Sequence, residues 1–414
     1  MNRREFAKAG GALGCAFPSA ARPAGVPPPR ITRVHTVEVR GVPTGKGLVL
    51  PWDARKIPQD TRDYVVAQFL TDQGIVGTTM DGDYRLPAGI GREVQSSAES
   101  YFLGKDPFEL EVHHKEFFRR KSPVRLLFLE IGLWDIIGQI AGQPLYRLWG
   151  AASTKVKAYA DTVHFGKTPR ERAEDAVKFY ERGFRAIKLR FHEIDPKKDL
   201  ALAEAVVRAV SGRMDVMVDA NQATFQKGDP PPVWDFERAA NMARALEEMG
   251  VYWLEEPLNR YAYEDLARLR RQLRRMHLAG GQTNTGDDFR QFLLHGSYSY
   301  LQPDPVTGAT VSWMRKIAAM AEAFGVLFGP HHGKSGVGLL ANIHLHCAVP
   351  NSGHLEYMYD PGYWNPEGFQ AGFVRPYPVD ESGYVHAPSK PGLGADWDRA
   401  FFRKYGLHWP EPKA

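Results

Sequence analysis

The chain has 414 residues, 43% of them hydrophobic and 24% charged, so it is neither disordered nor fibrous and can fill a barrel-sized domain plus a smaller one. Its formal net charge of +5 is small for this length and gives no support to a nucleic-acid partner. Two cysteines, Cys15 and Cys347, exclude a disulfide framework and a cysteine-based zinc cluster.

The first thirty residues have the pattern of an export signal. Arg3 and Arg4 precede a weakly apolar stretch at 9–17, and a proline-rich linker follows. We predict a twin-arginine signal peptide and linker over residues 1–30, which would make the protein periplasmic; without that signal it would be cytoplasmic. The alternative is a disordered tail that contains an arginine pair. No later run reaches the 18 apolar residues that a membrane span requires, so we expect no span.

Residues 31–150 predict an α+β domain. Alternation at 31–39 indicates a strand, and the turn residues at 72–74 between two β-rich runs indicate a hairpin. Apolar residues at three- and four-residue spacing over 126–150 indicate helices. The glycine- and proline-rich stretch 41–60 is too long for a turn, and we expect it to be a loop of the kind that forms a lid.

From Val156 onward, strand and helix patterns alternate. Thr168, Pro169 and Glu171 form a capping signal for one helix, which Gly183 should end. Two further helices should occupy 200–210 and 312–324, each ending at a glycine. The arginine-rich segment 268–275 has leucines at helical spacing and is predicted to be a solvated helix face. With 157–163 as the first strand, eight strands can be placed, either in a closed barrel or in an open doubly wound sheet.

Each apolar run in this part of the chain ends in polar residues. The clearest is 251–254, which ends in Glu255-Glu256-Pro257 and is typical of a buried strand that delivers acid groups to a surface. The other runs end near polar residues spaced 22 to 36 residues apart, enough for one strand plus one helix: Lys188, Asp219, Gln282, Asp304, His331 and Glu356. Because strand ends converge on one mouth in a barrel, this pattern favours the barrel.

Three of these residues are candidate metal ligands. Asp219, Glu255 and Gln282 would project from three successive strand ends in register, and hard oxygen ligands suit Mg²⁺ better than zinc or copper. The alternative for any one of them is the N-cap of the following helix, but three together favour the metal.

Four other residues are candidates for proton transfer and substrate binding. Lys188 and Arg190 are two apart on one strand, so their side chains point the same way. Asp304 and His331 follow neighbouring strands and could form a pair in which the carboxylate orients the imidazole as a base. His332 is the competitor of His331 for that role.

Taken in order, these motifs resemble the mandelate racemase and muconate lactonizing enzyme branch of the enolase superfamily. The motifs that carry the resemblance are Lys188-x-Arg190, Asp219-x-Asn221, Glu255-Glu256-Pro257, Gly280-Gly281-Gln282, Gln302-Pro303-Asp304, Pro330-His331 and Glu356, together with the segment 133–150. The resemblance implies an α/β fold, a modified TIM barrel of (β/α)7β type at 151–360. It also implies an α+β capping domain at 31–150, completed by the C-terminal segment 361–414.

The same resemblance implies Mg²⁺ and abstraction of the proton α to a carboxylate. It assigns catalytic roles to Lys188, Arg190, Asp304, His331 and Glu356, and places Asn221, Glu256 and His332 beside the ligands or the substrate. The expected partner is a small-molecule carboxylate, a sugar acid, and we also expect a homo-oligomer.

Two departures from the family pattern restrict the function. Gln282 stands where the family has an acidic ligand, so one negative charge is missing from the metal site. Arg190 stands where a second lysine would act as a base, and a guanidinium is a poor proton acceptor, which disfavours a two-base racemase. We therefore predict dehydration of a sugar acid to a 2-keto-3-deoxy acid. The alternatives are a racemase or epimerase of a hydroxy acid, and a catalytically impaired binding protein.

Overall fold

The computed structural model of the chain describes residues 27–50, 58–119, 126–225, 229, 231–407 and 409. The twin arginines and the apolar stretch of the predicted signal lie outside the described residues. No helix in the described part of the chain is long and apolar enough to cross a membrane.

Three strands near the N-terminus form an antiparallel sheet in the order β1-β2-β3: β1 (Ile31–Leu48), β2 (Gln59–Thr71) and β3 (Val76–Asp83). The hairpin predicted at 72–74 is present, with Gly74 at φ +79°. The loop predicted at 41–60 is wrong for 41–48 and for 59–60, because β1 continues to Leu48 and β2 begins at Gln59, which pairs with it. Register irregularities and a left-handed Gly41 let the ladder pass the glycines and prolines. Residues 51–57 lie outside the described residues.

The helices that follow the sheet are α1 (Ile90–Phe102), α2 (Leu110–His113), the π-helix η1 (His114–Phe118), α4 (Leu129–Ile140) and α5 (Leu145–Leu148). Helix α4 is buried on nearly all sides because it lies between the sheet and the barrel. Gly132 faces the sheet, where a Cβ on Gly77 would lie 2.1 Å from the Gly132 carbonyl oxygen. On the barrel side, Glu130 accepts a hydrogen bond from the backbone N–H of Ser312 at 2.7 Å.

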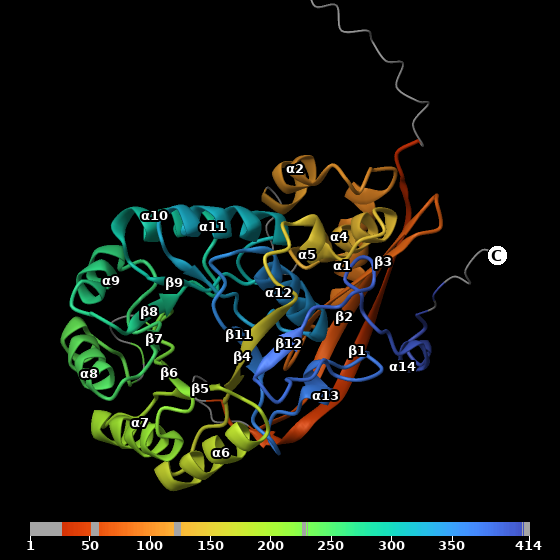
Figure 1. Cartoon of the computed structure of the whole chain (residues 1–414). Coiled ribbons are helices and arrows are strands. Elements are labelled where there is room, and N and C mark those ends of the chain that lie inside the picture. Colours follow the sequence, from red (N-terminus) through yellow and green to blue (C-terminus); the bar gives the residue numbers. More distant parts are fainter. Residues whose placement is uncertain are drawn as a thin grey trace, which may run out of the picture.

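Eight parallel strands then form a ring: β4 (Lys155–Asp161), β5 (Ala186–Arg190), β6 (Asp215–Asp219), β7 (Trp253–Glu255), β8 (His277–Gly280), β9 (Tyr300–Leu301), β10 (Leu327–Phe328) and β11 (Leu355–Met358). Among the described residues, seven helices connect them: α6 (Pro169–Glu181), α7 (Pro196–Val210), α8 (Phe236–Glu248), α9 (Tyr263–Arg270), α10 (Gly286–His295), α11 (Val311–Ala323) and α12 (Gly336–Ala348). β11 pairs with β4, and a bridge between Phe328 and Ser352 closes the ring (Figure 1). The predicted (β/α)7β barrel is confirmed, and the open sheet is excluded.

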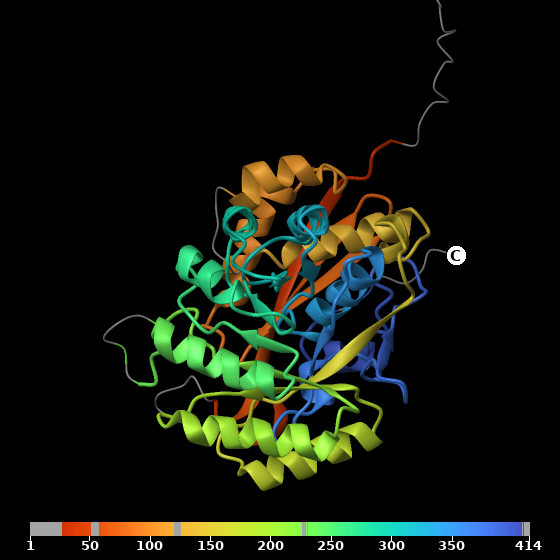
Figure 2. The ribbon, with the colours of Figure 1, turned by 60° about the vertical axis from the view of Figure 1, so that its left-hand side comes forward.

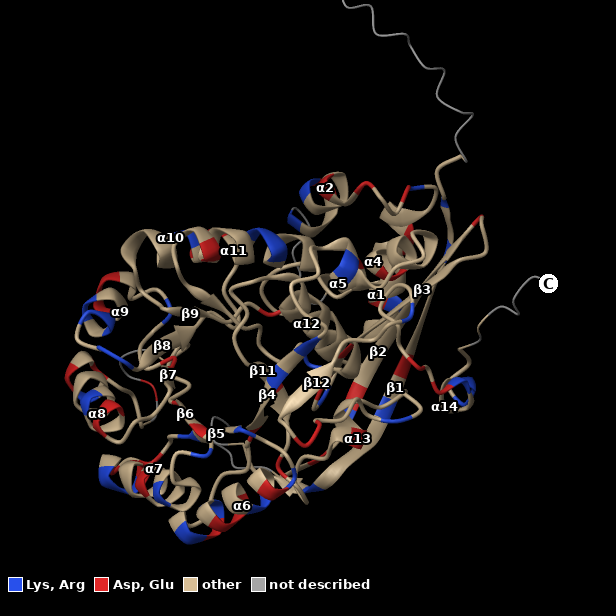
Figure 3. Ribbon diagram, in the orientation of Figure 1, with Lys and Arg blue, Asp and Glu red and all other residues tan. Residues whose placement is uncertain are grey.

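The helix signals in the sequence are found in the structure. Thr168 and Glu171 form a capping box at the start of α6, and Gly183 follows its end. Helix α7 begins at Pro196, earlier than predicted, because Asp195 caps it. Helix α9 ends at Arg270, so only the first part of the arginine-rich segment is helical. Figure 3 shows charges of both signs on α9 and on its neighbours.

The C-terminal segment joins the barrel to the N-terminal sheet. Its elements are α13 (Pro366–Phe369), β12 (Tyr384–His386) and α14 (Arg399–Arg403). β12 pairs antiparallel with β4, and the Tyr64 hydroxyl on β2 donates a hydrogen bond to the carbonyl of Gly368. Figure 2 shows this segment beside both β4 and the sheet. The sheet is thereby fixed over the mouth of the barrel.

Candidate active site

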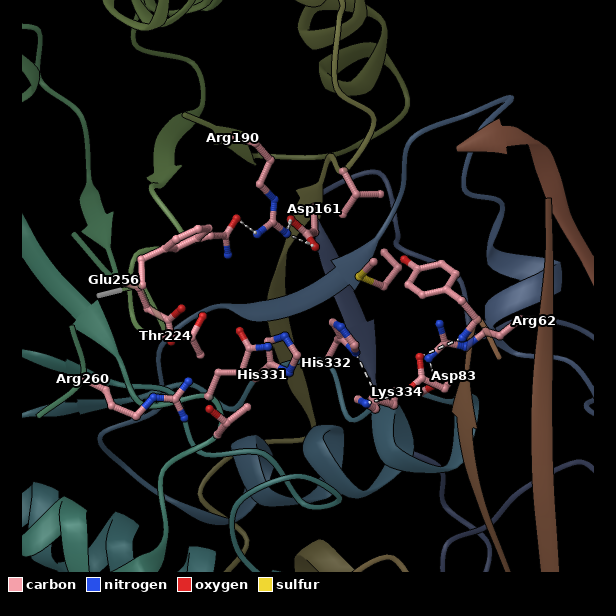
Figure 4. A pocket seen from close by; sticks show the side chains of 17 residues that line it. Arg62, Asp83, Asp161, Arg190, Thr224, Glu256, Arg260, His331, His332 and Lys334 are labelled. Atoms are coloured by element: carbon pink, nitrogen blue, oxygen red, sulfur yellow. Dashed lines mark hydrogen bonds and ion pairs between the residues drawn. The ribbon is translucent and has the colours of Figure 1, made fainter. Parts of the chain in front are cut away.

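The polar residues predicted from strand ends gather at one end of the barrel. Inside the ring, an apolar layer of Tyr159, Ala186, Met217, Trp253, Ala279 and Tyr300 fills the middle of the barrel. On four strands, the residue two positions further along is polar and points the same way: Asp161, Lys188, Asp219 and Glu255. Above this polar layer lies a cavity of about 340 Å³, closed on one side by the N-terminal sheet (Figure 4).

Lys188 is fully buried among carboxylates. Its Nζ lies 2.6 Å from Glu356 Oε1, 3.1 Å from Glu255 Oε2 and 3.3 Å from the Tyr159 hydroxyl. Burial lowers the pKa of the ammonium group, but the surrounding carboxylates, Asp161 first among them, outweigh burial and raise it. Lys188 is therefore a permanent cation at the floor of the cavity.

Arg190 is tied to two strand-end aspartates. Its Nη2 lies 2.5 and 2.7 Å from the two carboxylate oxygens of Asp161, and its Nη1 donates to Asp219. Burial lowers the pKa of the guanidinium, but the two aspartates outweigh it and raise the pKa. These surroundings are consistent with the prediction that Arg190 is a poor proton acceptor.

The structure brings Asp304 and His331 together as predicted. His331 Nδ1 lies 2.5 Å from Asp304 Oδ2, and the backbone N–H groups of Val306 and Thr307 donate to the other carboxylate oxygen. Burial lowers the pKa of His331, but Glu356 and Asp304 outweigh it and raise the pKa above the usual 6.5. The second ring nitrogen of His331, Nε2, lies 3.9 Å from Glu356 Oε2.

His332 has different contacts from its neighbour. Its Nδ1 accepts a hydrogen bond from the backbone N–H of Lys334 at 2.9 Å, and its own backbone N–H donates to Glu356 Oε2. Burial and the adjacent His331 hold the pKa of His332 well below 6.5. The ring is thus a neutral part of the cavity wall whose Nδ1 is already occupied.

Glu356 is surrounded by donors. One of its oxygens faces Lys188 Nζ and the other accepts the backbone N–H of His332. Burial raises the pKa of Glu356, but Lys188 and the two histidines outweigh it and hold the pKa well below 4.5. Glu356 is therefore an ionised acceptor, and it has no proton to donate to a substrate.

The candidate metal ligands lie on adjacent strands, but only two are in register. Asp219 pairs in register with Glu255, whereas the register partner of Glu255 on β8 is Ala279. Gln282 lies beyond the end of β8 and is directed to the cavity wall through Gly281, which has φ +120°. The expectation of three ligands in register is thus wrong, although Gln282 does line the cavity.

Two left-handed residues follow the ligand-bearing strands. Asn221 has φ +49°, and it donates to Asp219 through both its backbone N–H and its side-chain amide at 2.7 Å. Glu256 has φ +45°, is 5% exposed and lines the cavity, and its carboxylate has no hydrogen-bond donor among the described residues. Burial and Asp219 raise the pKa of Glu256 to about 7. Such backbone strain is typical of functional sites.

Sequence reasoning missed several residues of the cavity wall. Asp161 ends β4, so the strand-end pattern could have revealed it. Arg62, Asp83 and Tyr84 come from β2, β3 and the residue after β3. No sequence pattern pointed to these three, because their place over the barrel mouth depends on how the sheet packs.

Comparisons with known proteins agree with this geometry. A sequence profile described as "Enolase C-terminal domain-like" matches residues 171–401, more than half of the chain. The chain belongs to the enolase superfamily. The matched range contains every strand-end residue from Lys188 to Glu356, whereas Asp161 and Arg62 lie before it.

Similar superfamily proteins cover most of the chain. It is 28% identical over 280 residues to the arabinonate dehydratase of Saccharolobus solfataricus, and the aligned region covers 67% of this chain and 70% of that protein. It is 28% identical over 367 residues to the D-galactonate dehydratase of Variovorax paradoxus, covering 80% and 92%. A crystal structure of a mandelate racemase-like protein from Bordetella bronchiseptica superimposes with a TM-score of 0.79 at 26% identity, covering 93% of this chain and 99% of that one.

Proposed function

We propose that this protein is a sugar-acid dehydratase that uses His331 as its single base. Two kinds of observation support the proposal. The chain is similar over most of its length to proteins named as dehydratases of sugar acids. The cavity contains one carboxylate-oriented imidazole, beside a buried lysine that can bind a carboxylate.

The contact with Asp304 selects the tautomer of His331. With the proton on Nδ1 donated to Asp304, the Nε2 lone pair is free to accept a proton. Asp304 is fixed by backbone donors, so it orients the ring and stabilises the imidazolium that forms. Lys188 provides the positive charge that holds the substrate carboxylate near this nitrogen.

The residue in the position of a second base, Arg190, favours dehydration over racemisation because it is a poor proton acceptor. Racemisation needs a proton acceptor or donor on each face of the α-carbon. Arg190 is the residue at the corresponding position, and its guanidinium is engaged by Asp161 and Asp219 with a raised pKa. A racemase is therefore the weaker alternative.

We propose Mg²⁺ as the cofactor, held by Asp219, Glu255 and Gln282. The residues present fit a cation, because buried carboxylates outnumber permanent cations at the mouth. At the barrel strand ends, six carboxylates compare with two cations: Asp161, Asp219, Glu255, Glu256, Asp304 and Glu356 against Lys188 and Arg190. The other cations that line the cavity do not come from those strand ends: Arg62, Arg260 and Lys334. Glu256, which has no donor among the described residues, adds a further oxygen to the set. Bound Mg²⁺ would act as a Lewis acid that stabilises negative charge on the substrate carboxylate.

The proposed reaction removes one molecule of water from a 2,3-dihydroxy acid. His331 Nε2 takes the proton from C2, and the resulting imidazolium then protonates the departing 3-hydroxyl. The C3–O bond breaks, and the enol that remains tautomerises to a 2-keto-3-deoxy acid. Glu356, ionised beside Lys188, keeps that lysine in place and does not act as an acid.

A second candidate is a binding protein that has lost activity, which the amide of Gln282 favours. Incubating the purified protein with a library of aldonic and aldaric acids, with and without Mg²⁺, separates the two. The dehydratase requires a 2-keto acid product from at least one sugar acid in the presence of Mg²⁺. Ligand binding without any keto acid across the library would contradict it. Periplasmic location and a homo-oligomer remain predictions.

A further inference from the structure

Arg62 is a buried cation on the cavity wall with no carboxylate partner. It lies on β2, is 2% exposed and lines the cavity from the side of the N-terminal sheet. In the part of the chain that the structure describes, no carboxylate oxygen lies within 4.0 Å of its guanidinium, and its Nε has no hydrogen-bond partner. Burying a charge without a counterion is costly, so this arrangement calls for an explanation.

The contacts of Arg62 hold its guanidinium in place without neutralising it. Nη2 donates to the carbonyl oxygens of Gly82 at 2.9 Å and Lys334 at 2.6 Å. Four aromatic rings surround the guanidinium at 5.2 to 5.9 Å from their centroids: Tyr84, Trp364, Phe369 and Tyr64. The rings favour a cation and keep water away, so an anion reaching this position would be attracted strongly.

The carboxylates nearest to Arg62 have other partners. Asp83 pairs with Lys334 Nζ at 3.0 Å, and Asp81 accepts the backbone N–H of Gly82 at 2.7 Å. Since Asp83 and Lys334 pair with each other, neither neutralises Arg62, which has no direct counterion among the described residues. Arg260, at the other end of the cavity, also lacks a carboxylate within 4.0 Å among the described residues, but it is partly exposed and water can solvate it.

Arg62 and Glu256, the residue next to the proposed ligand Glu255, line the same cavity. In Figure 4, Arg62 and Lys334 lie on one side of His331 and His332, while Glu256 lies on the other. A linear acid with its α-carbon at His331 and its C1 carboxylate toward Lys188 and the metal ligands can therefore extend its distal end toward Arg62.

We propose that Arg62, with Lys334 beside it, binds a second anionic group at the distal end of the substrate. The substrate is then a doubly anionic sugar acid, with a terminal carboxylate or a terminal phosphate, and not a simple aldonic acid. This inference rests on the proposed function for the position of C1.

The test is calorimetric titration of the full-length protein with Mg²⁺ present, using matched ligands. The pairs are gluconate with glucarate, galactonate with galactarate and mannonate with mannarate, and 6-phosphogluconate distinguishes a phosphate from a carboxylate. We expect at least one doubly anionic member to bind about tenfold or more tightly than its singly anionic partner, as for a hydrogen-bonded charge pair. Equal affinities in every pair, or no binding of any doubly anionic ligand, would overturn the proposal.

Variants then assign the preference to Arg62. Arg62→Gln should abolish it, and Arg62→Lys should retain part of it. The matched control is Arg40→Gln, on β1 of the same sheet, where the arginine pairs with Glu38 and Asp63 away from the cavity; this variant should keep the preference. If Arg62→Gln fails to fold, Lys334→Gln should still reduce the preference. A full preference in folded Arg62→Gln, or in Lys334→Gln when that is the only folded variant, would contradict the assignment.

Turnover separates this inference from the proposed function. Binding of a doubly anionic acid through Arg62 with no keto acid formed would contradict the dehydratase and leave the Arg62 site intact. Keto acid formed from aldonic acids, with equal binding of both members of every pair, would support the dehydratase and contradict the Arg62 site.

Discussion

His331 Nδ1 lies 2.5 Å from Asp304 Oδ2, and this contact determines which nitrogen of His331 faces the cavity. It also connects two strand ends, after β9 and after β10, so the geometry of the base depends on the pairing of these neighbouring strands. In the described part of the chain, no carboxylate oxygen lies within 4.0 Å of a ring nitrogen of His332, the next residue, and its pKa is well below 6.5. The two adjacent histidines are therefore chemically different.

The pH dependence of catalysis should depend on the contact between His331 and Asp304. Because the pKa of His331 is raised above 6.5 and the base must be unprotonated, kcat/KM should rise with pH through that raised pKa. Asp304→Asn removes a carboxylate that stabilises the imidazolium, so the acid limb should move to lower pH and kcat should fall roughly 100-fold or more. Asp235→Asn, at the exposed N-cap of α8, is the matched control and should leave the profile in place. An unshifted acid limb in Asp304→Asn would contradict this role for Asp304.

Lys188→Met should destabilise the fold, because it leaves Glu255 and Glu356 buried without their cation. We expect the free energy of unfolding at pH 7 to fall by about 3–5 kcal/mol, measured by urea denaturation. The folded-state pKa of Glu356 is depressed, so its ion pair stabilises the protein above about pH 4.5 and is lost as the pH falls through the lower folded value. The difference between the two proteins should therefore shrink below pH 4.5.

The control for Lys188 is Lys157→Met. Lys157 pairs with Asp215 at 2.8 Å, but both side chains are about one-third exposed, so the loss should be below about 1 kcal/mol. Similar losses in the two variants would show that the Lys188 cluster contributes no more than a surface ion pair.

Mg²⁺ affinity should respond to the missing negative charge at residue 282. Gln282→Glu should tighten Mg²⁺ binding by roughly tenfold, and Glu255→Gln should weaken it severely. Gln73→Glu, an exposed turn residue on the N-terminal sheet, controls for added charge alone. Calorimetry on these proteins decides the point. If none of them binds Mg²⁺, the proposed cofactor is wrong and the binding-protein alternative gains support.

Export can be tested in the native host. Replacing Arg3 and Arg4 by lysine should leave precursor in the cytoplasm, because the apolar stretch after them is weak. Immunoblots of periplasmic and cytoplasmic fractions give the answer. Wild-type protein that stays in the cytoplasm with an intact N-terminus would rule out the signal.

The barrel and its polar strand ends could be predicted from sequence because each depends on local pattern. Strand alternation places Lys188 and Arg190 on one face, and the apolar runs before Asp219 and Glu255 place both acids at strand ends. The pairing of His331 with Asp304 followed from their positions on neighbouring strands. These inferences need only the period of the elements and their order along the chain.

The rest depends on contacts between distant segments. β1 continues through 41–48 because bulges absorb its glycines, which a list of turn residues does not reveal. Gln282 lies outside the strand register because a left-handed Gly281 redirects the chain. Arg62 reaches the cavity only because the N-terminal sheet packs over the barrel mouth. The ionised state of Glu356 follows from donors on two other strand ends and was likewise not visible in the sequence.

The central claim is that His331 alone removes the α-proton and that water is then lost. Turnover of an active sugar acid in D₂O, with the product analysed by NMR, tests it directly. We expect a 2-keto-3-deoxy acid with deuterium at C3. His331→Asn should reduce the rate roughly 1,000-fold, whereas His332→Asn should keep most of it, because the asparagine oxygen can still accept the Lys334 N–H. A C2 epimer carrying deuterium as the main product, or full activity in His331→Asn, would contradict the account.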